Sequence, residues 1–274
     1  MSTRTITPSP VSGVANSVGQ FVFGVGLWLR GFVIYVRNPR LMLLGLLPAA
    51  VTGALFLAAL VALAVASPQL ADALTPFADE WTGWLQTLVR ASVILALLGI
   101  TALVGVLVFT GVTLAIGEPF YERISEWVED RCGGVVNPAE VSWLRSLRWS
   151  ISDSIRTDVL SAAVGVPLFI AGFLPVVGQT VVPALGAALG GWLLALKLTA
   201  GPFGRRGRRL ADRRQALRGV RMATLGFGVT AFLAFLVPLG AILFTPAAVA
   251  GATLLTRHAL GEPTDELGEP ADEG

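Results

Sequence analysis

Residues 159–196 read VLSAAVGVPLFIAGFLPVVGQTVVPALGAALGGWLLAL, and this stretch of 38 residues without a charge decides the fold. A helix needs about 20 apolar residues to cross the hydrocarbon core of a bilayer. The run is therefore too long for one crossing and too short for two crossings with a turn. Pro175 and Pro183 lie near its middle, and proline breaks a helix because it lacks a donor and clashes one turn back. Residues 222–256 repeat this pattern with Pro238 and Pro246.

The composition places the whole chain in a membrane. Apolar residues make up 54% of the 274 residues, charged residues only 14%, and the mean hydropathy is +0.72. A soluble domain carries roughly 25% charged residues, so a soluble enzyme is excluded. Cys132 and His258 are the only residues of their types, which leaves no disulfide, metal cluster or Cys–His pair. Because no Walker or dinucleotide glycine motif is present, we expect no catalytic site and no cofactor.

Two other charge-free runs predict ordinary transmembrane helices, at residues 41–66 and 91–117. Residues 17–32 are apolar but interrupted by glycine, and we expect an interfacial helix there. Residues 1–16 and the acidic tail 259–274 have the composition of disordered ends. Everything between them, residues 17–258, is predicted to form a single membrane domain.

The distribution of arginine sets the topology, because cytoplasmic loops are enriched in Lys and Arg. Arg30, Arg37 and Arg40 precede the first span, whereas the connection between the two spans carries three acids and only Arg90. Both termini are therefore predicted to be cytoplasmic, and each proline-broken run begins and ends on the cytoplasmic side. Each half of such a run has about 16 residues and forms a helix roughly 24 Å long, less than the hydrocarbon thickness of about 30 Å. Each run is therefore predicted to enter the membrane and turn back without crossing it. Two tight pairs of full spans with unusually short turns are the alternative.

The predicted fold class is thus an all-α integral membrane protein. It contains two full transmembrane helices, two proline-broken, half-penetrating helical hairpins (residues 159–196 and 222–256) and cytoplasmic amphipathic helices. The amphipathic helices are expected within residues 118–158, where apolar side chains recur at helical spacing from Phe120 to Ile155. A basic loop at residues 201–221 connects the two hairpins.

Several ordered motifs resemble one known family. FLPVVGQTVVP at 173–183 is similar to a Pro-x-x-Gly-Gln-Thr-x-x-Pro stretch of the CysZ sulfate permeases, and GPF at 201–203 is similar to their Tyr-Pro-Phe. LGFG at 225–228, Pro238, PAAVAGAT at 246–253 and EPFYERISE at 118–126 match in the same order. The resemblance covers roughly residues 20–256, and the wider superfamily includes the eukaryotic etoposide-induced endoplasmic-reticulum proteins. It implies an oligomeric inner-membrane protein that takes up sulfate for cysteine biosynthesis.

Arginines near the first span are the candidate anion site. The family tends to place adjacent arginines before the proline of its first span, but the corresponding residues here are Met42 and Leu43. Arg30, Arg37 and Arg40 could serve instead, since a helix N-terminus and arginine forks both bind oxyanions. Alternatively, these arginines only set the topology and contact lipid phosphate.

The breaks in the two hairpins are the candidate pathway, because paired proline- or glycine-interrupted segments are typical of transport sites. The residues concerned are Pro175, Gly178, Gln179, Thr180, Pro183, Pro238 and Pro246. Gln179 and Thr180 could line an ion path, or they could satisfy broken backbone or a neighbouring helix.

Eight arginines lie within 17 residues of the basic loop, with one acid among them. The sequence has no aromatic residue in this cluster, so we expect anionic lipid headgroups as its partner and no nucleic acid. The lipid-facing basic cluster comprises Arg205, Arg206, Arg208, Arg209, Arg213 and Arg214.

These features favour a membrane permease or channel for a small oxyanion, sulfate foremost, working as a homo-oligomer. The four apolar runs contain no acid or base, which is unusual for a coupled transporter and favours a passive channel. The alternative is a membrane scaffold that organises lipid without transporting anything.

Overall fold

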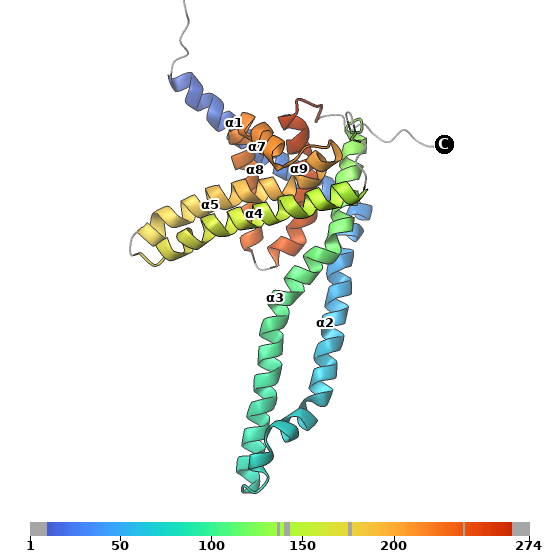
Figure 1. Cartoon of the computed structure of the whole chain (residues 1–274), viewed down its shortest axis with the longest axis vertical. Coiled ribbons are helices and arrows are strands. Elements are labelled where there is room, and N and C mark those ends of the chain that lie inside the picture. The colour runs from blue at the N-terminus through green and yellow to red at the C-terminus, as the bar shows by residue number, and fades with distance from the viewer. Residues whose placement is uncertain (1–9, 136–137, 140–142, 175–176, 238, 265–274) are drawn as a thin grey trace, which may run out of the picture. The chain divides into compact units, whose positions relative to one another are not determined.

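The computed structural model describes residues 10–135, 138–139, 143–174, 177–237 and 239–264, and every regular element in them is helical (Figure 1). They form two compact units, one of residues 44–120 and one of the residues up to 43 together with those from 121 onward. The elements, in chain order, are α1 (Pro10–Arg37), α2 (Pro39–Leu74), η1 (Pro76–Ala78), α3 (Gly83–Arg131), α4 (Trp143–Ala171), α5 (Val177–Leu198), α6 (Ala200–Arg205), α7 (Leu210–Gly219), α8 (Arg221–Leu236) and α9 (Gly240–Ala259).

Five segments of the described chain are long and apolar enough to cross a membrane. They are Asn16–Arg37, Pro39–Leu74, Gly83–Gly105, Gly178–Leu198 and Gly240–Ala259. Helices α7 and α8 would add a sixth if the pair, bent by 105°, counted as one span. The prediction of an all-α, multi-pass membrane protein is confirmed, and α1 is long enough to cross where only an interfacial helix was expected.

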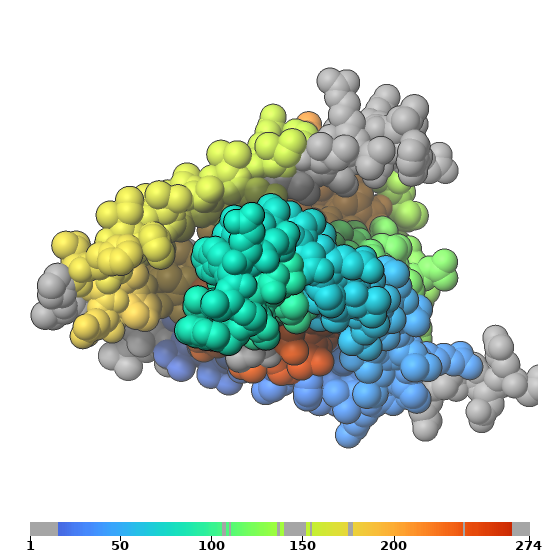
Figure 2. Space-filling view, turned by 90° about the horizontal axis from the view of Figure 1, so that it is seen from below, coloured from blue at the N-terminus to red at the C-terminus, as the bar shows by residue number. Residues whose placement is uncertain are grey.

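The unit of residues 44–120 is an antiparallel hairpin of α2 and α3. Phe56 and Phe109 pack across it with ring centroids 6.2 Å apart. At its tip, Arg90 bridges Asp72 (3.0 Å) and Asp79 (2.8 Å), and Figure 2 shows the teal residues of this tip as one compact group. Most of the apolar side chains along the hairpin are exposed, which suits a surrounding lipid phase.

The other unit is built around α9. In its apolar window 83% of the residues are buried, compared with 28% for the window in α1 and 17% for the window in α5. Helices α1 and α8 pack against α9, and α5 packs against α8. These helices approach closely through glycine: a methyl group on Gly31 of α1 would lie 2.4 Å from the Gly251 nitrogen of α9, and one on Gly228 of α8 would lie 2.2 Å from the Gly191 oxygen of α5.

Both proline-broken runs form two helices joined by a short turn. Helices α4 and α5 lie side by side (Figure 1), with the break after Ala171, and α8 and α9 are separated between Leu236 and Gly240. Each run breaks only once, however, because Pro183 lies inside α5 and Pro246 inside α9. A proline costs a helix one hydrogen bond, which apolar helices with neighbours tolerate. Pro175 and Pro238 lie outside the described residues.

Several element boundaries in the structure differ from the expected ones. Helix α1 begins at Pro10, so residues 10–16 are helical, while residues 1–9 lie outside the described part. The expected separate amphipathic helices are extensions of longer ones, because α3 continues through Pro119 to Arg131 and α4 runs unbroken from Trp143 to Ala171. Residues 259–264 of the expected disordered tail are described and take part in the contacts below, while residues 265–274 lie outside the description.

The close contact between α1 and α9 generates the first prediction. Gly31→Ala places a methyl group against the α9 backbone, and overpacking of this kind costs about 1–3 kcal/mol. We expect a lower midpoint of thermal unfolding, followed by tryptophan fluorescence in detergent. Gly26→Ala in the same helix is the control, since a methyl group there meets nothing within 4 Å and alanine favours helix. Equal midpoints for the two variants would contradict the packing.

Candidate functional site: a buried cluster of arginines and glutamates

The last turn of α3 carries a completely buried carboxylate. Glu129 has no exposed side-chain surface, although its neighbours Glu126 and Asp130 are exposed. Its Oε1 accepts a hydrogen bond from Nη1 of Arg206 (2.6 Å), and its Oε2 accepts from Nη2 of Arg206 (2.9 Å). Arg257 Nη1 donates to the same Oε2 at 2.7 Å. A buried carboxylate needs such partners, because removing it from water unpaired costs several kcal/mol.

Arg257 of α9 also binds the backbone at the end of α3. Its Nη1 donates to the carbonyl of Gly134 at 2.7 Å and its Nη2 to the carbonyl of Cys132. Gly133 and Gly134 have φ angles of 93° and 80°, which turn the chain so that these carbonyls face the guanidinium. The C-terminal end of a helix carries partial negative charge, so a cation placed there is favoured.

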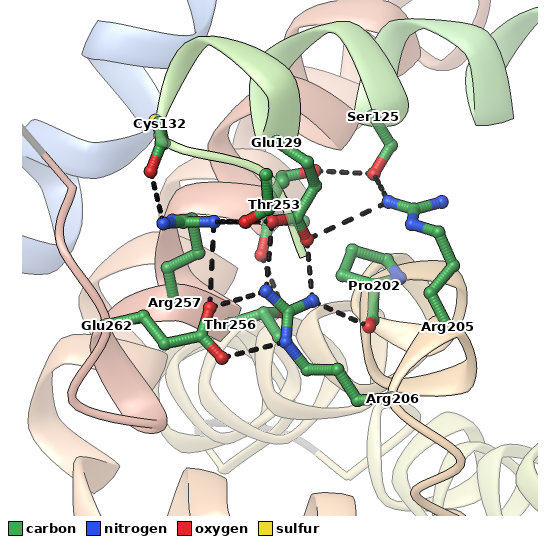
Figure 3. Close-up of polar contacts among 12 residues, drawn as sticks. Ser125, Glu129, Cys132, Pro202, Arg205, Arg206, Thr253, Thr256, Arg257 and Glu262 are labelled. Atoms are coloured by element: carbon green, nitrogen blue, oxygen red, sulfur yellow. Dashed lines mark hydrogen bonds and ion pairs between the residues drawn. The ribbon is translucent and has the colours of Figure 1, made fainter. Parts of the chain in front are cut away.

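Arg206 follows α6 and uses its whole guanidinium. Besides the two contacts with Glu129, Nη1 donates to the Pro202 carbonyl (2.9 Å), and Nε donates to Oε1 of Glu262 (2.8 Å). Nη2 also donates to the second oxygen of Glu262, as Figure 3 shows. Burial by itself lowers the pKa of Arg206, but the hydrogen bonds to Glu129 and Glu262 outweigh burial and raise it.

Arg205 has a different environment. Its Nη2 donates to the Ser125 hydroxyl and lies 3.9 Å from Oε1 of Glu129. The Ser125 hydroxyl in turn shares a hydrogen bond of 2.7 Å with the hydroxyl of Thr253. Its Nε and Nη1 are buried without a hydrogen-bond partner in the described structure. Burial lowers the pKa of Arg205, although the charge of Glu129 opposes this effect.

The cluster therefore joins α3, α6, α9 and the segment after α9 in one unit (Figure 3). Arg205, Arg206 and Arg257 face Glu129 and Glu262, so three positive charges meet two negative ones. Such a cluster can stabilise helix packing and can bind an additional anion, whereas none of its groups is an evident nucleophile or general base.

Comparison with known proteins decides the family. Residues 27–246 match the family model described as Sulfate transporter CysZ/Etoposide-induced protein 2.4. The chain belongs to this family.

Individual relatives agree with the family model. A protein named sulfate transporter CysZ from Pectobacterium atrosepticum is 30% identical over 64% of this chain and 63% of its own length. A second, from Pseudomonas paraeruginosa, is 30% identical over 83% of this chain and 92% of its own length, and one from Pseudomonas fluorescens is 29% identical over 83% and 90%. The resemblance seen in the sequence motifs is thereby confirmed.

The arginines that were predicted to bind the anion lie outside the buried cluster. Arg30 and Arg37 are on α1 and Arg40 is in the first turn of α2, and all three are exposed. The hydrogen bonds of Asn38 to Ile34, Leu41 and Met42 hold the short connection between α1 and α2. An anion-binding role for the three arginines in this CysZ-family chain remains a prediction.

The predicted hairpin residues occupy unlike environments. Gln179, Thr180 and Pro183 are exposed on α5, and Gly178 is half-buried beside the turn. A methyl group on Gly178 would lie 2.1 Å from the Gly172 oxygen, so the turn requires glycine there. Pro246 is buried in α9.

The basic cluster divides into buried and exposed members. Arg208 is exposed and Arg209 and Arg214 are partly exposed, so for these three a lipid-facing role stays a prediction. Arg206 and Arg213 are buried and do not face lipid, so for these two the prediction is wrong. Arg206 is withdrawn from lipid because Glu129 and Glu262, 77 and 56 residues away in sequence, pair with it.

Glu129, Arg257 and Glu262 were not predicted to be members of one site. Glu262 falls in the tail 259–274 that was predicted to be disordered. The sequence carries no signal for Glu129, because helical spacing places it with Glu118, Glu122 and Glu126 and away from the apolar stripe of Ile124 and Val128.

Removal of the central charge is the second prediction. Glu129→Gln leaves Arg206 and Arg257 without their shared carboxylate, and breaking a buried pair typically costs about 3–5 kcal/mol. We expect a marked fall in the midpoint of thermal unfolding in detergent. Asp130→Asn changes the same charge at the exposed neighbour and should leave the midpoint nearly unchanged. A similar midpoint for both variants would show that the pairing is not structurally important.

For Arg213 of α7 we expect, in contrast to Glu129, that removal of the buried charge does not lower stability. Burial lowers its pKa to about 10, partly opposed by the charge of Asp153, and its Nε has no hydrogen-bond partner in the described structure. The folded state therefore holds this proton less tightly than the unfolded chain, and the charge costs stability at any pH below about 10. We expect Arg213→Met to unfold at the same or a higher temperature at pH 7. Arg214→Met is the control, and a fall confined to Arg213→Met would refute the argument.

Proposed function

We propose that this protein is a permease for sulfate or a similar small oxyanion in a bacterial inner membrane, supplying sulfur for cysteine biosynthesis, and that it is not an enzyme. The observation that carries this proposal is the family match across residues 27–246, together with relatives named sulfate transporter CysZ. The five apolar helices supply the membrane embedding that a permease needs. Nothing in the comparisons favours a scaffold that does not transport.

In our proposal, α2 and α3 cross the bilayer, while the α4–α5 and α8–α9 hairpins enter from the cytoplasmic side and turn back. Arg156, which precedes the charge-free part of α4, and Lys197 at the end of α5 are both exposed and support a common cytoplasmic side. The turn region of α4–α5 exposes Phe169, Ile170 and Phe173 by 63–76%, which suits burial in lipid or against a second copy of the chain. A homo-oligomer with both termini in the cytoplasm is therefore part of the proposal.

The exposed arginines near the start of α2 are the proposed point of anion entry. Arg37 and Arg40 flank Asn38, whose carbonyl accepts the backbone N–H groups of Leu41 and Met42 in the first turn of α2. The two exposed guanidinium groups are therefore the donors that this connection offers to an anion. Arg30 lies two turns earlier on α1 and is also exposed. From there the anion would pass along the exposed Gln179 and Thr180 of α5. Movement would be passive.

Uptake by purified protein tests the proposal. Proteoliposomes that contain the wild-type chain should accumulate labelled sulfate faster than empty liposomes. Arg37→Ala/Arg40→Ala should reduce the initial rate by about tenfold, because a lost charged hydrogen bond is worth about 1.5–3 kcal/mol. Arg208→Ala/Arg218→Ala removes the same charge from exposed positions on and before α7 and should retain most of the rate. Uptake by the wild type no faster than by empty liposomes would refute transport.

A further inference from the structure

The segment that follows α9 inserts a carboxylate between two buried arginines. The Glu262 side chain is 11% exposed, and those of Arg206 and Arg257 are 3% and 1% exposed. Arg206 holds Glu262 with two parallel N–H donors, Nε at 2.8 Å and Nη2, while Arg257 Nη1 lies 3.6 Å from its Oε2 (Figure 3). A planar two-point contact of this kind is the geometry with which arginine recognises carboxylate, sulfate or phosphate.

The backbone of the same segment is also held in place. Arg257 Nε donates to the Pro263 carbonyl at 2.7 Å, and the Glu262 amide donates to the Arg257 carbonyl at 2.8 Å. The chain turns at Gly261, whose φ of 71° suits glycine, and it returns over the end of α9.

Departure of Glu262 would leave a strongly cationic site. Arg206 would keep its two bonds to Glu129 but would lose the acceptors of Nε and of one Nη2 proton. The three arginines and two glutamates give the cluster a net charge of +1, and without Glu262 this net charge would be +2. Two N–H donors, directed to one point beside Arg257, would then lack a partner in a site largely removed from water.

We propose that Arg206 and Arg257 form an oxyanion-binding site, that Glu262 occupies it as an intramolecular ligand, and that free sulfate competes with this carboxylate. The site is separate from Arg30, Arg37 and Arg40. A tethered ligand competes at an effective concentration in the millimolar range, so the site fills with the free anion only when that anion is abundant. The consequence, that cytoplasmic sulfate releases the segment after α9 and thereby controls flux, rests on the proposed function, whereas the binding site does not.

Calorimetric titration of the purified protein in detergent with sodium sulfate tests the site directly. All proteins carry Arg30→Ala/Arg37→Ala/Arg40→Ala, so that binding at these three arginines does not contribute. Glu262→Gln, and independently a chain that ends at Gly261, should bind sulfate about tenfold more tightly than the parent. Glu126→Gln, an exposed acid on α3, is the control and should bind like the parent. Adding Arg206→Lys to Glu262→Gln should abolish the gain, because lysine keeps the charge but lacks the fork.

Equal sulfate affinity in the parent, Glu262→Gln and the shortened chain would overturn the proposal. A measurement on the wild type avoids dependence on the folding of variants. Hydrogen exchange of the Glu262 amide should accelerate in sodium sulfate relative to sodium chloride of the same ionic strength, and identical exchange in the two salts would also overturn it. Neither experiment measures transport. A negative uptake assay would therefore not contradict the binding site, and a negative binding result would not contradict uptake.

Discussion

The buried carboxylate of Glu129 is the constraint on which the packed unit depends. Taking a carboxylate out of water is costly unless cations and hydrogen bonds replace the water, and Glu129 obtains both from Arg206 and Arg257. Those arginines lie 77 and 128 residues away in sequence. The end of α3, the residue after α6 and the end of α9 must therefore meet at one point. Since α9 is the most buried of the candidate spans, fixing its end also fixes the helices that pack around it.

Away from this cluster, close van der Waals packing holds the helices together. In a bilayer, apolar side chains gain little free energy when they move from lipid into a helix–helix interface, so helix association depends on close van der Waals contact. Gly31 against Gly251 and Gly191 against Gly228 bring backbones together at distances that no side chain would allow. Glycine contacts thus set how closely the helices approach, and the ion pairs at the end of α9 set which helix ends come together.

The membrane class and the division of each charge-free run into two helices could be predicted from the sequence, because a long absence of charge and a proline are local properties of the chain. Which proline would break each run could not, since Pro183 lies within α5, where it is exposed, and Pro246 lies within α9, where the surrounding helices bury it. The buried cluster was hidden for a related reason. Arg206 looks like any other arginine of a basic loop until Glu129 and Glu262, distant in sequence, are brought to it. Glu129 gives no warning either, because helical spacing places it among exposed acids such as Glu122 and Glu126, and only the folded structure buries it.

The environments of the arginines divide their roles. A permease must bind its anion weakly enough to release it, which favours hydrated cations such as Arg37 and Arg40 at an exposed connection. A guanidinium whose N–H groups are all directed to acceptors, as in Arg206, can accept an external anion only when one of its acceptors leaves. Glu129 is placed on helix α3, whereas Glu262 lies in the non-helical residues that follow α9. Of the two carboxylates, Glu262 is therefore the one that can move, and any response of this cluster to an anion must pass through it.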